Sequence, residues 1–320
     1  MDTTLPEGTL VSDRFRVKRV LSQAGGMGVL YECVQESTGR RVALKQMRPE
    51  ALRNPLLRDA FVEEAWAAAA ITHPNVVFVL DRGEDPTHGH WLVAEFLEGK
   101  NLEELLVAHG PLSPAELRCL FRQLCAGVGA GHTHGVVHCD LKPENIFVTN
   151  DGAAPSAWQV KVLDYGIARR IRWGKDVTAY EGFGTPCWMA PEQIGLVGNR
   201  VSATTDVWAL GLIAFYSLTG KHYQRAVYEK DAGPMAVRLE LVLRRDEIDP
   251  APVRAKQHGF EGHVPEGFDG WFQRCIARTP AERFTSAEAA FEALDVALGA
   301  DCSRAAEPRD AAAPPAPPLV

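Results

Sequence analysis

The sequence predicts an α+β protein in which a small strand-rich lobe is followed by a larger helical lobe. Before Gly99, most apolar residues alternate with polar ones, which is the pattern of half-buried strands. After Gly99, the apolar residues recur at the helical period in longer segments. Strands followed by helices along the chain are typical of α+β architecture. We therefore assign residues 1–97 to the strand-rich lobe and residues 98–298 to the helical lobe.

The strand-rich lobe starts with two alternating strands on either side of a glycine cluster, an arrangement that predicts a β-hairpin. An alanine- and glutamate-rich helix is expected at residues 56–71. Pro74 follows it closely and stops it, because a residue that precedes proline avoids helical conformations. The strands are expected at Phe15–Leu21, Val29–Val34, Arg41–Met47, Val76–Leu80 and His90–Phe96.

The longest predicted helix of the second lobe is Pro114–Thr133, which follows the capping pair Ser113 and Glu116. Residues 299–320 are mainly alanine, proline and charged residues, which cannot bury enough apolar surface to fold, so we expect a disordered tail. The other helices are expected at Thr205–Thr219, Pro234–Arg245, Phe268–Ala277 and Ser286–Leu298.

The composition is that of a folded, mildly acidic protein. Hydrophobic residues make up 46% of the 320 residues, and 34 basic against 41 acidic side chains give a net charge of −7. Nucleic-acid binding needs a basic surface, so no nucleic-acid partner is expected. Seven cysteines without a Cys-x-x-Cys spacing indicate reduced thiols, which predicts a cytoplasmic protein.

No direct membrane insertion is expected. The N-terminal segment lacks the basic opening and apolar core of a signal peptide. The longest apolar run, Val207–Leu218, is too short to cross a bilayer and suits a buried core helix. A homodimer, or a peripheral association through a regulatory partner protein, stays open.

Two features of the strand-rich lobe are compatible with phosphate binding. Gly25, Gly26 and Gly28 lie between the first two strands, where glycine lets backbone N–H groups approach phosphate oxygens. A plain hairpin turn would have the same composition. Lys45 closes the third strand, and by itself it indicates only an ammonium group at the surface.

The decisive segment is His138–Asn145, with the sequence His-Cys-Asp-Leu-Lys-Pro-Glu-Asn. Asp164 opens an Asp-Tyr-Gly run nineteen residues after Asn145, and Gly-Thr-Pro at 184–186 and Ala-Pro-Glu at 190–192 come later. Together with the glycines and Lys45, their order and spacing resemble those of protein kinases. The run Gly-Gly-Met-Gly and the run Gly-Thr-Pro-x-x-Met-Ala-Pro-Glu-Gln are similar to bacterial serine/threonine kinases of the eukaryotic (Hanks) type. The resemblance covers residues 10–298.

The resemblance implies a bilobal protein-kinase fold with ATP between the lobes. The γ-phosphoryl group would pass to serine or threonine hydroxyls of protein substrates, including this chain itself, in bacterial signalling. Asp140 would accept the proton of the acceptor hydroxyl, and Lys142 would stand beside the phosphoryl group in transfer. Asn145 and Asp164 would give hard oxygen ligands to Mg²⁺, for which Mn²⁺ could substitute.

The resemblance also implies a nucleotide site in the small lobe. Lys45 would hold the α and β phosphates, oriented by Glu64 of the alanine-rich helix, with the neighbouring Glu63 as the alternative partner. The nucleotide-binding residues come from the glycine-rich loop, the adenine roof and floor, the hinge and this ion pair: Ser22, Gln23, Ala24, Gly25, Gly26, Met27, Gly28, Val29, Leu30, Ala43, Lys45, Glu64, Glu95, Leu97 and Phe147.

Departures from the family pattern keep two other functions open. Gln23 replaces the first glycine of the phosphate loop, which would suit a pseudokinase that binds nucleotide without transferring phosphate. The presence of every reacting residue argues against that function. A small-molecule kinase is a third hypothesis, and the complete segment at 184–192, which docks peptides in the family, argues against it.

Two further groups of residues have both a structural and a functional interpretation. His132, His134 and His138 have a spacing that a metal site can use, but within this motif we expect them to pack and hydrogen-bond. Cys139 and Cys187 lie near the expected site, where we expect small, partly buried thiols and not redox sensors.

Cys139 leads to a prediction about regulation. Kinases activated by a phosphothreonine commonly bind it with an arginine beside the catalytic aspartate, in a charge-assisted pair that orders the activation segment. Cys139 has no cationic group, so phosphatase treatment or Thr178→Ala should slow transfer by less than about tenfold, or about 1.4 kcal/mol of barrier. A larger loss would mean that the basic residues at 169–175 bind a phosphate instead.

Overall fold

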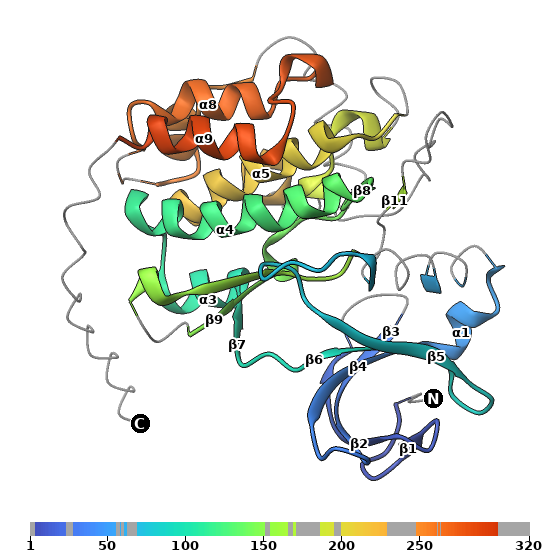
Figure 1. Cartoon of the computed structure of the whole chain (residues 1–320). Helices are drawn as coiled ribbons and strands as arrows, with labels where there is room; N and C mark the ends of the chain where they lie inside the picture. The colour runs from blue at the N-terminus through green and yellow to red at the C-terminus, as the bar shows by residue number, and fades with distance from the viewer. Residues whose placement is uncertain are drawn as a thin grey trace, which may run out of the picture.

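The computed structural model describes residues 4–23, 28–55, 58, 61–62, 69–150, 154–165, 169–170, 186–194, 200–228, 248–260, 262 and 264–299. These residues form two lobes, a curled sheet at the N-terminal end and a set of helices after it (Figure 1). Most of the helix expected at 56–71, the whole of that expected at Pro234–Arg245 and the tail beyond Gly299 lie outside the described residues.

The N-terminal lobe is a six-stranded antiparallel sheet. Its strands are β1 (Leu10–Val11), β2 (Phe15–Ser22), β3 (Gly28–Gln35), β4 (Arg41–Met47), β5 (Val79–Asp85) and β6 (Gly89–Glu95), in the spatial order β1-β2-β3-β4-β6-β5. The pairing of β2 with β3 confirms the hairpin predicted around the glycine cluster. The strand expected at Val76–Leu80 begins later, because Val76 and Val77 pair with Val162 of the other lobe.

Strand alternation gives this sheet two different faces. On the enclosed face, Val29, Tyr31 and Cys33 of β3 pack with apolar residues of β4 and β6, and all three are at most 1% exposed. On the opposite face, Leu30 of β3 lies beside Lys45 of β4 in the strand register. The alternation therefore turns the Lys45 side chain away from the core of the sheet.

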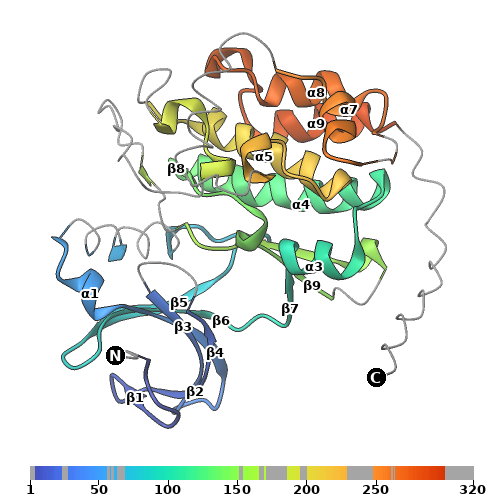
Figure 2. The ribbon, with the colours of Figure 1, turned by 180° about the vertical axis from the view of Figure 1, so that it is seen from behind.

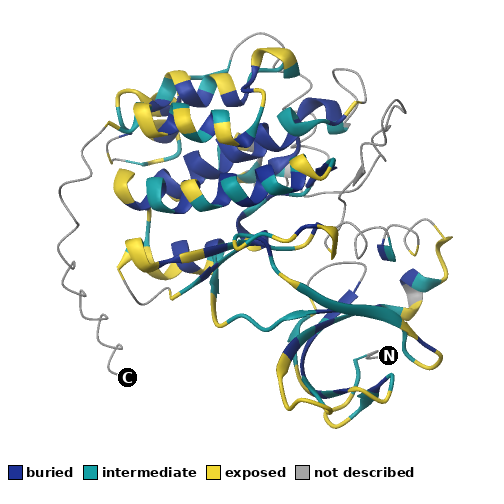
Figure 3. Cartoon of the chain, viewed as in Figure 1, coloured by how far each residue is buried: buried dark blue, intermediate teal, exposed yellow. Residues whose placement is uncertain are grey.

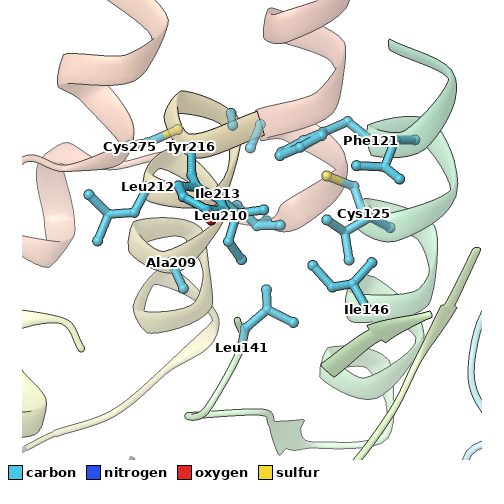
Figure 4. Packing of buried hydrophobic residues seen from close by; sticks show 14 of the residues in the cluster. Phe121, Cys125, Leu141, Ile146, Ala209, Leu210, Leu212, Ile213, Tyr216 and Cys275 are labelled. Carbon is cyan, nitrogen blue, oxygen red and sulfur yellow. The ribbon is translucent and has the colours of Figure 1, made fainter. Parts of the chain in front are cut away.

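The C-terminal lobe is built around α4 (Pro114–Thr133) and α5 (Ala203–Thr219). α4 has the predicted bounds, and its capping box is present, with Ser113 N donating to Glu116 Oε2 at 2.6 Å. α5 is buried along nearly its whole length (Figure 3), which confirms that its apolar run is a core helix. Phe121 of α4 and Ile213 of α5 belong to the same packed cluster (Figure 4).

The other helices surround this pair. α8 (Phe268–Cys275) and α9 (Ala287–Ala297) confirm two predicted helices, whereas α1 (Pro49–Leu52), α3 (Leu102–His109) and α7 (Ala251–Gln257) were not predicted. Short 3₁₀ turns lie at Pro143–Asn145, Pro155–Ala157, Pro186–Trp188, Pro191–Ile194, Arg225–Tyr228 and Pro280–Glu282.

Two small sheets follow the N-terminal lobe along the chain. The chain runs from β6 through β7 (Gly99–Asn101) into α3 (Figure 2), and β7 pairs with β9 (Ile146–Thr149), which pairs with β10 (Gln159–Val162). β8 (Val136–Val137) pairs with β11 (Arg169–Arg170). The β9–β10 hairpin thus lies beside the strand that follows the N-terminal lobe.

A partly exposed ion pair connects the two lobes at this hairpin. Lys161 Nζ of β10 lies 2.6 Å from Glu95 Oε1 at the end of β6, and the same oxygen accepts Phe78 N at 2.8 Å. Val77 N donates to Val162 O at 3.0 Å. The segment before β5 and the end of β6 are therefore both bonded to β10.

One carboxylate ties together two turns of the N-terminal lobe. Asp85 Oδ2 accepts Ser12 N at 2.5 Å, and Asp85 Oδ1 accepts Thr87 N and His88 N at 2.8 and 2.9 Å. Burial alone would raise the pKa of Asp85, but the three backbone N–H groups outweigh burial and lower this pKa to about 2.

Asp85→Asn should lower the free energy of unfolding by about 2 kcal/mol at pH 7, because hydrogen bonds to an ionised group are lost. The folded pKa lies below the ordinary value, so the stabilisation is present above about pH 4 and is lost as the pH falls toward about 2. Urea unfolding of both proteins at pH 7, 4 and 3 should therefore show a difference that shrinks in acid. Asp81→Asn, which removes a more exposed ion pair with Arg14, is the control and should cost less than about 1 kcal/mol. A difference for Asp85→Asn that is the same at every pH would contradict this role.

Candidate active site

The β9–β10 hairpin brings together residues that are far apart in the sequence. Asn145 immediately precedes β9, and Asp164 lies two residues after β10. The pairing of Ile146 with Val162 is continued by a hydrogen bond from Leu163 N to Asn145 O at 2.8 Å. Because the open end of the hairpin is closed by this hydrogen bond, Asn145 and Asp164 lie side by side at the same edge of the sheet.

Asp140 and Lys142 lie on the loop between β8 and β9, beside Asn145. Asn145 Nδ2 donates to the backbone oxygen of Asp140 at 2.8 Å and contacts its Oδ2 at 3.4 Å. Lys142 Nζ lies 3.1 Å from Asp140 Oδ2. The loop therefore places an ammonium group and an amide each within hydrogen-bond distance of the Asp140 carboxylate.

A buried carboxylate on α5 holds the start of this loop. Asp206, 1% exposed, accepts His138 N and Cys139 N at 2.9 Å each, and His132 Nε2 of α4 at 2.8 Å. Burial alone would raise the pKa of Asp206, but its hydrogen bond to His132, the nearby histidines and the backbone N–H lower this pKa below its ordinary value. Cys139 has a φ of 62°, a left-handed conformation that non-glycine residues adopt rarely. The Asp206 carboxylate thus fixes the backbone of the two residues that precede Asp140, His138 and Cys139.

The residue after Asp164 connects the hairpin to the core of the lobe. The ring of Tyr165 lies 4.7 Å from that of His138, and its hydroxyl donates to Gly127 O at 3.1 Å. A Cβ at Gly131, one turn along α4, would come within 2.9 Å of the Tyr165 ring. Glycine at that position of the helix therefore leaves room for a tyrosine beside Asp164.

Lys45 of β4 meets this site from the N-terminal lobe. Its Nζ lies 2.5 Å from Asp164 Oδ1, and the Lys45 side chain is 19% exposed against 43% for Asp164. Glu64, the partner expected for Lys45, lies outside the described residues. The sheet face that carries Lys45 is therefore the face turned toward the C-terminal lobe.

The segment Pro186–Ile194 is anchored under the site by a buried ion pair. Arg283 Nη1 and Nη2 donate to the two carboxylate oxygens of Glu192 at 2.8 and 2.9 Å. Thr205 Oγ1 of α5 adds a third hydrogen bond, also at 2.8 Å. Both charges are at most 1% exposed, so removing either would leave the other buried without its partner.

Comparisons with known proteins agree with this arrangement. The sequence model of the family described as protein kinase domain matches residues 16–294. Serine/threonine-protein kinase PknD of Mycobacterium tuberculosis is 34% identical over 274 residues, which cover 85% of this chain and 38% of PknD. PknL of the same organism is 30% identical over 301 residues, covering 94% of this chain and 68% of PknL.

The chain belongs to the protein kinase family. Its curated relatives include bacterial serine/threonine kinases, as the sequence motifs predicted. They include pkn2 of Myxococcus xanthus, which is 35% identical over 68% of this chain and 25% of its own length. The chain thus spans from a quarter to about two fifths of the length of the first of these relatives.

The fold is also that of known kinases. A double mutant of the Mycobacterium tuberculosis PknI kinase domain superimposes with a TM-score of 0.69 and 22% sequence identity, covering 92% of this chain and 100% of that structure. The bilobal α+β kinase fold predicted from the sequence is thereby confirmed.

The expected adenine pocket is distributed over both lobes of the kinase. Leu30 of β3 and Ala43 of β4 lie on the sheet face turned toward the C-terminal lobe, and both are partly exposed. Ala43 lies opposite Ala94 of β6 in the strand register. Phe147 of β9 and Leu97, which follows β6, are also partly exposed.

The glycine-rich loop is described only at its two ends. Ser22 ends β2, and Gln23 O accepts Arg48 Nη2 at 2.7 Å. A Cβ at Gly28 would lie 2.9 Å from Gln46 O, so the close approach of β3 to β4 requires glycine there. Ala24, Gly25, Gly26 and Met27 lie outside the described residues. Val29 packs in the sheet core, as described above, and its side chain does not share the face of Leu30.

Two contacts near the expected hinge, residues 95–97, were not predicted from the sequence. Arg41 lies 2.5 Å from Glu98 Oε1, and its guanidinium lies 4.1 Å from the ring centroid of Phe96. Lys161 binds Glu95 across 66 residues of chain. In each case the partners are ordinary surface-type residues, and only the fold brings them together, so no local sequence signal could have identified them.

The histidines singled out in the sequence have separate partners. His132 binds Asp206, His134 Nδ1 contacts Ala130 O at 2.8 Å, and His138 Nε2 contacts Leu163 O at 2.9 Å. Among the described residues, no three histidine, cysteine or acidic side chains are placed to hold a metal together. Burial raises the pKa of the Cys187 thiol to about 12, so it is mostly protonated near neutral pH.

Lys45→Met should reduce phosphoryl transfer by at least about 100-fold, because the cation that faces Asp164 and the expected phosphate position is lost. Asp164→Ala should weaken the part of nucleotide affinity that depends on divalent metal. Transfer assays and nucleotide titrations with and without EDTA measure the two effects. Lys256→Met, on the exposed side of α7, is the matched control and should behave as wild type. Wild-type activity that survives EDTA would rule out the metal role of Asp164.

Proposed function

We propose that this chain is an ATP-dependent serine/threonine protein kinase that phosphorylates protein substrates, including itself. The observation that supports this most strongly is the group formed by Asp140, Lys142 and Asn145, with Lys45 and Asp164 joined beside it across the lobes. Phosphoryl transfer depends mainly on position and charge neutralisation, and this group offers both anions and cations at one edge of the sheet. The small lobe, residues 1–97, would bind the nucleotide, and residues 98–298 would bind the substrate and carry out transfer.

In this mechanism Asp140 orients the acceptor hydroxyl and takes its proton as the oxygen attacks the γ-phosphorus, while the bond from the γ-phosphorus to the β,γ-bridging oxygen breaks and ADP leaves. Lys142 neutralises the developing charge from the side of Asp140, to which it lies within 3.1 Å. Lys45 releases Asp164 and binds the α and β phosphates when the nucleotide enters. The hydrogen bond from Asn145 to the Asp140 backbone oxygen restrains the backbone that carries the carboxylate.

The donor set at this edge fits a hard divalent cation. Nδ2 of Asn145 is directed at Asp140, which leaves Oδ1 as the end of the amide that can face a cation. Asp164 adds carboxylate oxygens from the adjacent end of the hairpin. Mg²⁺, with Mn²⁺ as a substitute, would neutralise phosphate charge at this position. Asn145 and Asp164 would hold it.

The cellular setting is proposed from the same sequence features. The reduced thiols favour a cytoplasmic protein. Its substrates would be proteins, and its activity would be controlled by homodimerisation or by a regulatory partner protein. None of the helices that the structure describes has both the length and the apolar composition needed to cross a bilayer.

Asp140→Asn should lower the transfer rate by at least about 100-fold while ATP affinity stays within twofold, because general-base removal typically costs that much. A radiolabelled ATP assay with a basic acceptor protein measures the rate, and calorimetry measures nucleotide affinity. Asp295→Asn, which removes an ion pair between α9 and Arg118 of α4, is the control. Turnover by Asp140→Asn near the wild-type rate would overturn the assignment. A wild-type protein that binds nucleotide but transfers no phosphate would indicate a pseudokinase.

A further inference from the structure

We propose that Gln193 is a positioning residue that fixes the orientation of the Asp140 peptide group relative to the segment Pro186–Ile194. This inference rests on the proposed function, because it assigns the segment a part in presenting the acceptor to Asp140. Gln193 connects the segment Pro186–Ile194 to the catalytic loop through neutral hydrogen bonds. Because position 139 is a cysteine and not an arginine, it cannot connect the same two elements by binding a phosphate.

The Gln193 amide joins two backbone groups from different elements. Its Oε1 accepts Ala190 N at 3.0 Å, and its Nε2 donates to Cys139 O at 2.7 Å. One bond therefore returns to the segment that carries Gln193, and the other crosses to the catalytic loop.

Only a neutral amide satisfies both partners of Gln193. The N–H of Ala190 needs an acceptor, and the carbonyl of Cys139 needs a donor. A carboxylate at position 193 would place a lone pair against the Cys139 carbonyl, and an apolar side chain would leave both groups without a partner. Since both backbone partners have fixed polarity, the orientation of the amide is fixed as well.

The Cys139 carbonyl belongs to the peptide group that contains Asp140 N, so Gln193 acts directly on the residue that bears the catalytic carboxylate. The other side of Cys139 is held by Asp206 Oδ1, which accepts its N–H at 2.9 Å. A left-handed φ of 62° at a cysteine is sparsely populated and persists only where neighbours fix it. Gln193 and Asp206 supply that restraint from opposite sides.

The other end of the link is equally rigid. Ala190 is fully buried, and Glu192 beside Gln193 is held by Arg283 and Thr205. Gln193 thus transmits the position of a well-anchored segment to the loop.

Charge explains why this link matters in this chain. Cys139 is 6% exposed, packs with Val137 and Val201, and carries no cation that could bind a phosphate on the segment. A pair of neutral hydrogen bonds does not depend on phosphorylation. Gln193 would therefore keep the segment and the loop in register whether or not the segment is phosphorylated.

Two variants of Gln193 remove either both of its hydrogen bonds or only the one to the catalytic loop. Gln193→Leu removes both hydrogen bonds, and Gln193→Glu, which has nearly the same shape, keeps the bond from Ala190 N and loses the one to Cys139 O. Each should lower kcat with a protein acceptor by at least about tenfold, equivalent to about 1.4 kcal/mol of barrier, while the Kd for ATP stays within twofold.

Gln123→Leu is the matched control. Gln123 also joins two backbone groups, donating to Trp158 O at 2.9 Å and accepting Val160 N at 3.1 Å, and its Oε1 accepts Asn75 Nδ2 at 3.1 Å as well. It lies between α4 and β10, with no contact to the catalytic loop among these hydrogen bonds. It should lose a similar amount of thermal stability and keep its kcat.

The outcomes distinguish this inference from the proposed function. A wild-type protein that transfers no phosphate overturns the proposed function, and the role of Gln193 with it. An active wild type with unchanged kcat in both Gln193 variants overturns the inference alone. Equal losses of kcat in Gln193→Leu and Gln123→Leu, or a parallel loss of ATP affinity, would mean that Gln193 only stabilises the fold, which also overturns the inference.

Discussion

The geometry of the site depends on one buried carboxylate. Asp206 is enclosed by the C-terminal lobe and accepts two consecutive backbone N–H groups, those of His138 and Cys139, together with the ring of His132. A buried anion is costly unless it is fully hydrogen-bonded, so the surrounding chain must keep these donors in place. The carboxylate thereby determines the conformation of the backbone from which Asp140 projects.

Each remaining part of the site is tied to that loop by hydrogen bonds. Asn145 binds the Asp140 backbone, and the β9–β10 hairpin sets Asp164 beside Asn145. Lys45 brings the N-terminal sheet to Asp164, and Lys161 fastens the end of β6 to β10. The lobes are therefore connected at the strands that carry the metal-binding and phosphate-binding candidates, and a shift of one lobe changes the distance between these groups.

The sequence predicted what local patterns determine. The hairpin of β2 and β3 and the bounds of α4 were both foreseen, because alternation and a capping box mark them. α3 was missed, although Asn101 and Glu104 form a capping box there as well, because it is only two turns long. β5 was placed too early because the hydrogen bonds of Val76 and Val77 go to the other lobe. Long-range contacts such as Lys161 with Glu95 have no local signal, so they required the fold.

The most direct test of this account measures amide hydrogen exchange at His138 and Cys139 in the nucleotide-free protein, with and without Asp206→Asn. If Asp206 fixes the loop, both amides in the wild type exchange as slowly as those in the core of α5, that is, only through global unfolding. In Asp206→Asn, they should exchange at least about tenfold faster than the core of α5, because one acceptor oxygen is replaced by a donor. Fast exchange of these two amides in the wild type, or unchanged protection in the variant, would contradict the claim that this carboxylate holds the catalytic loop.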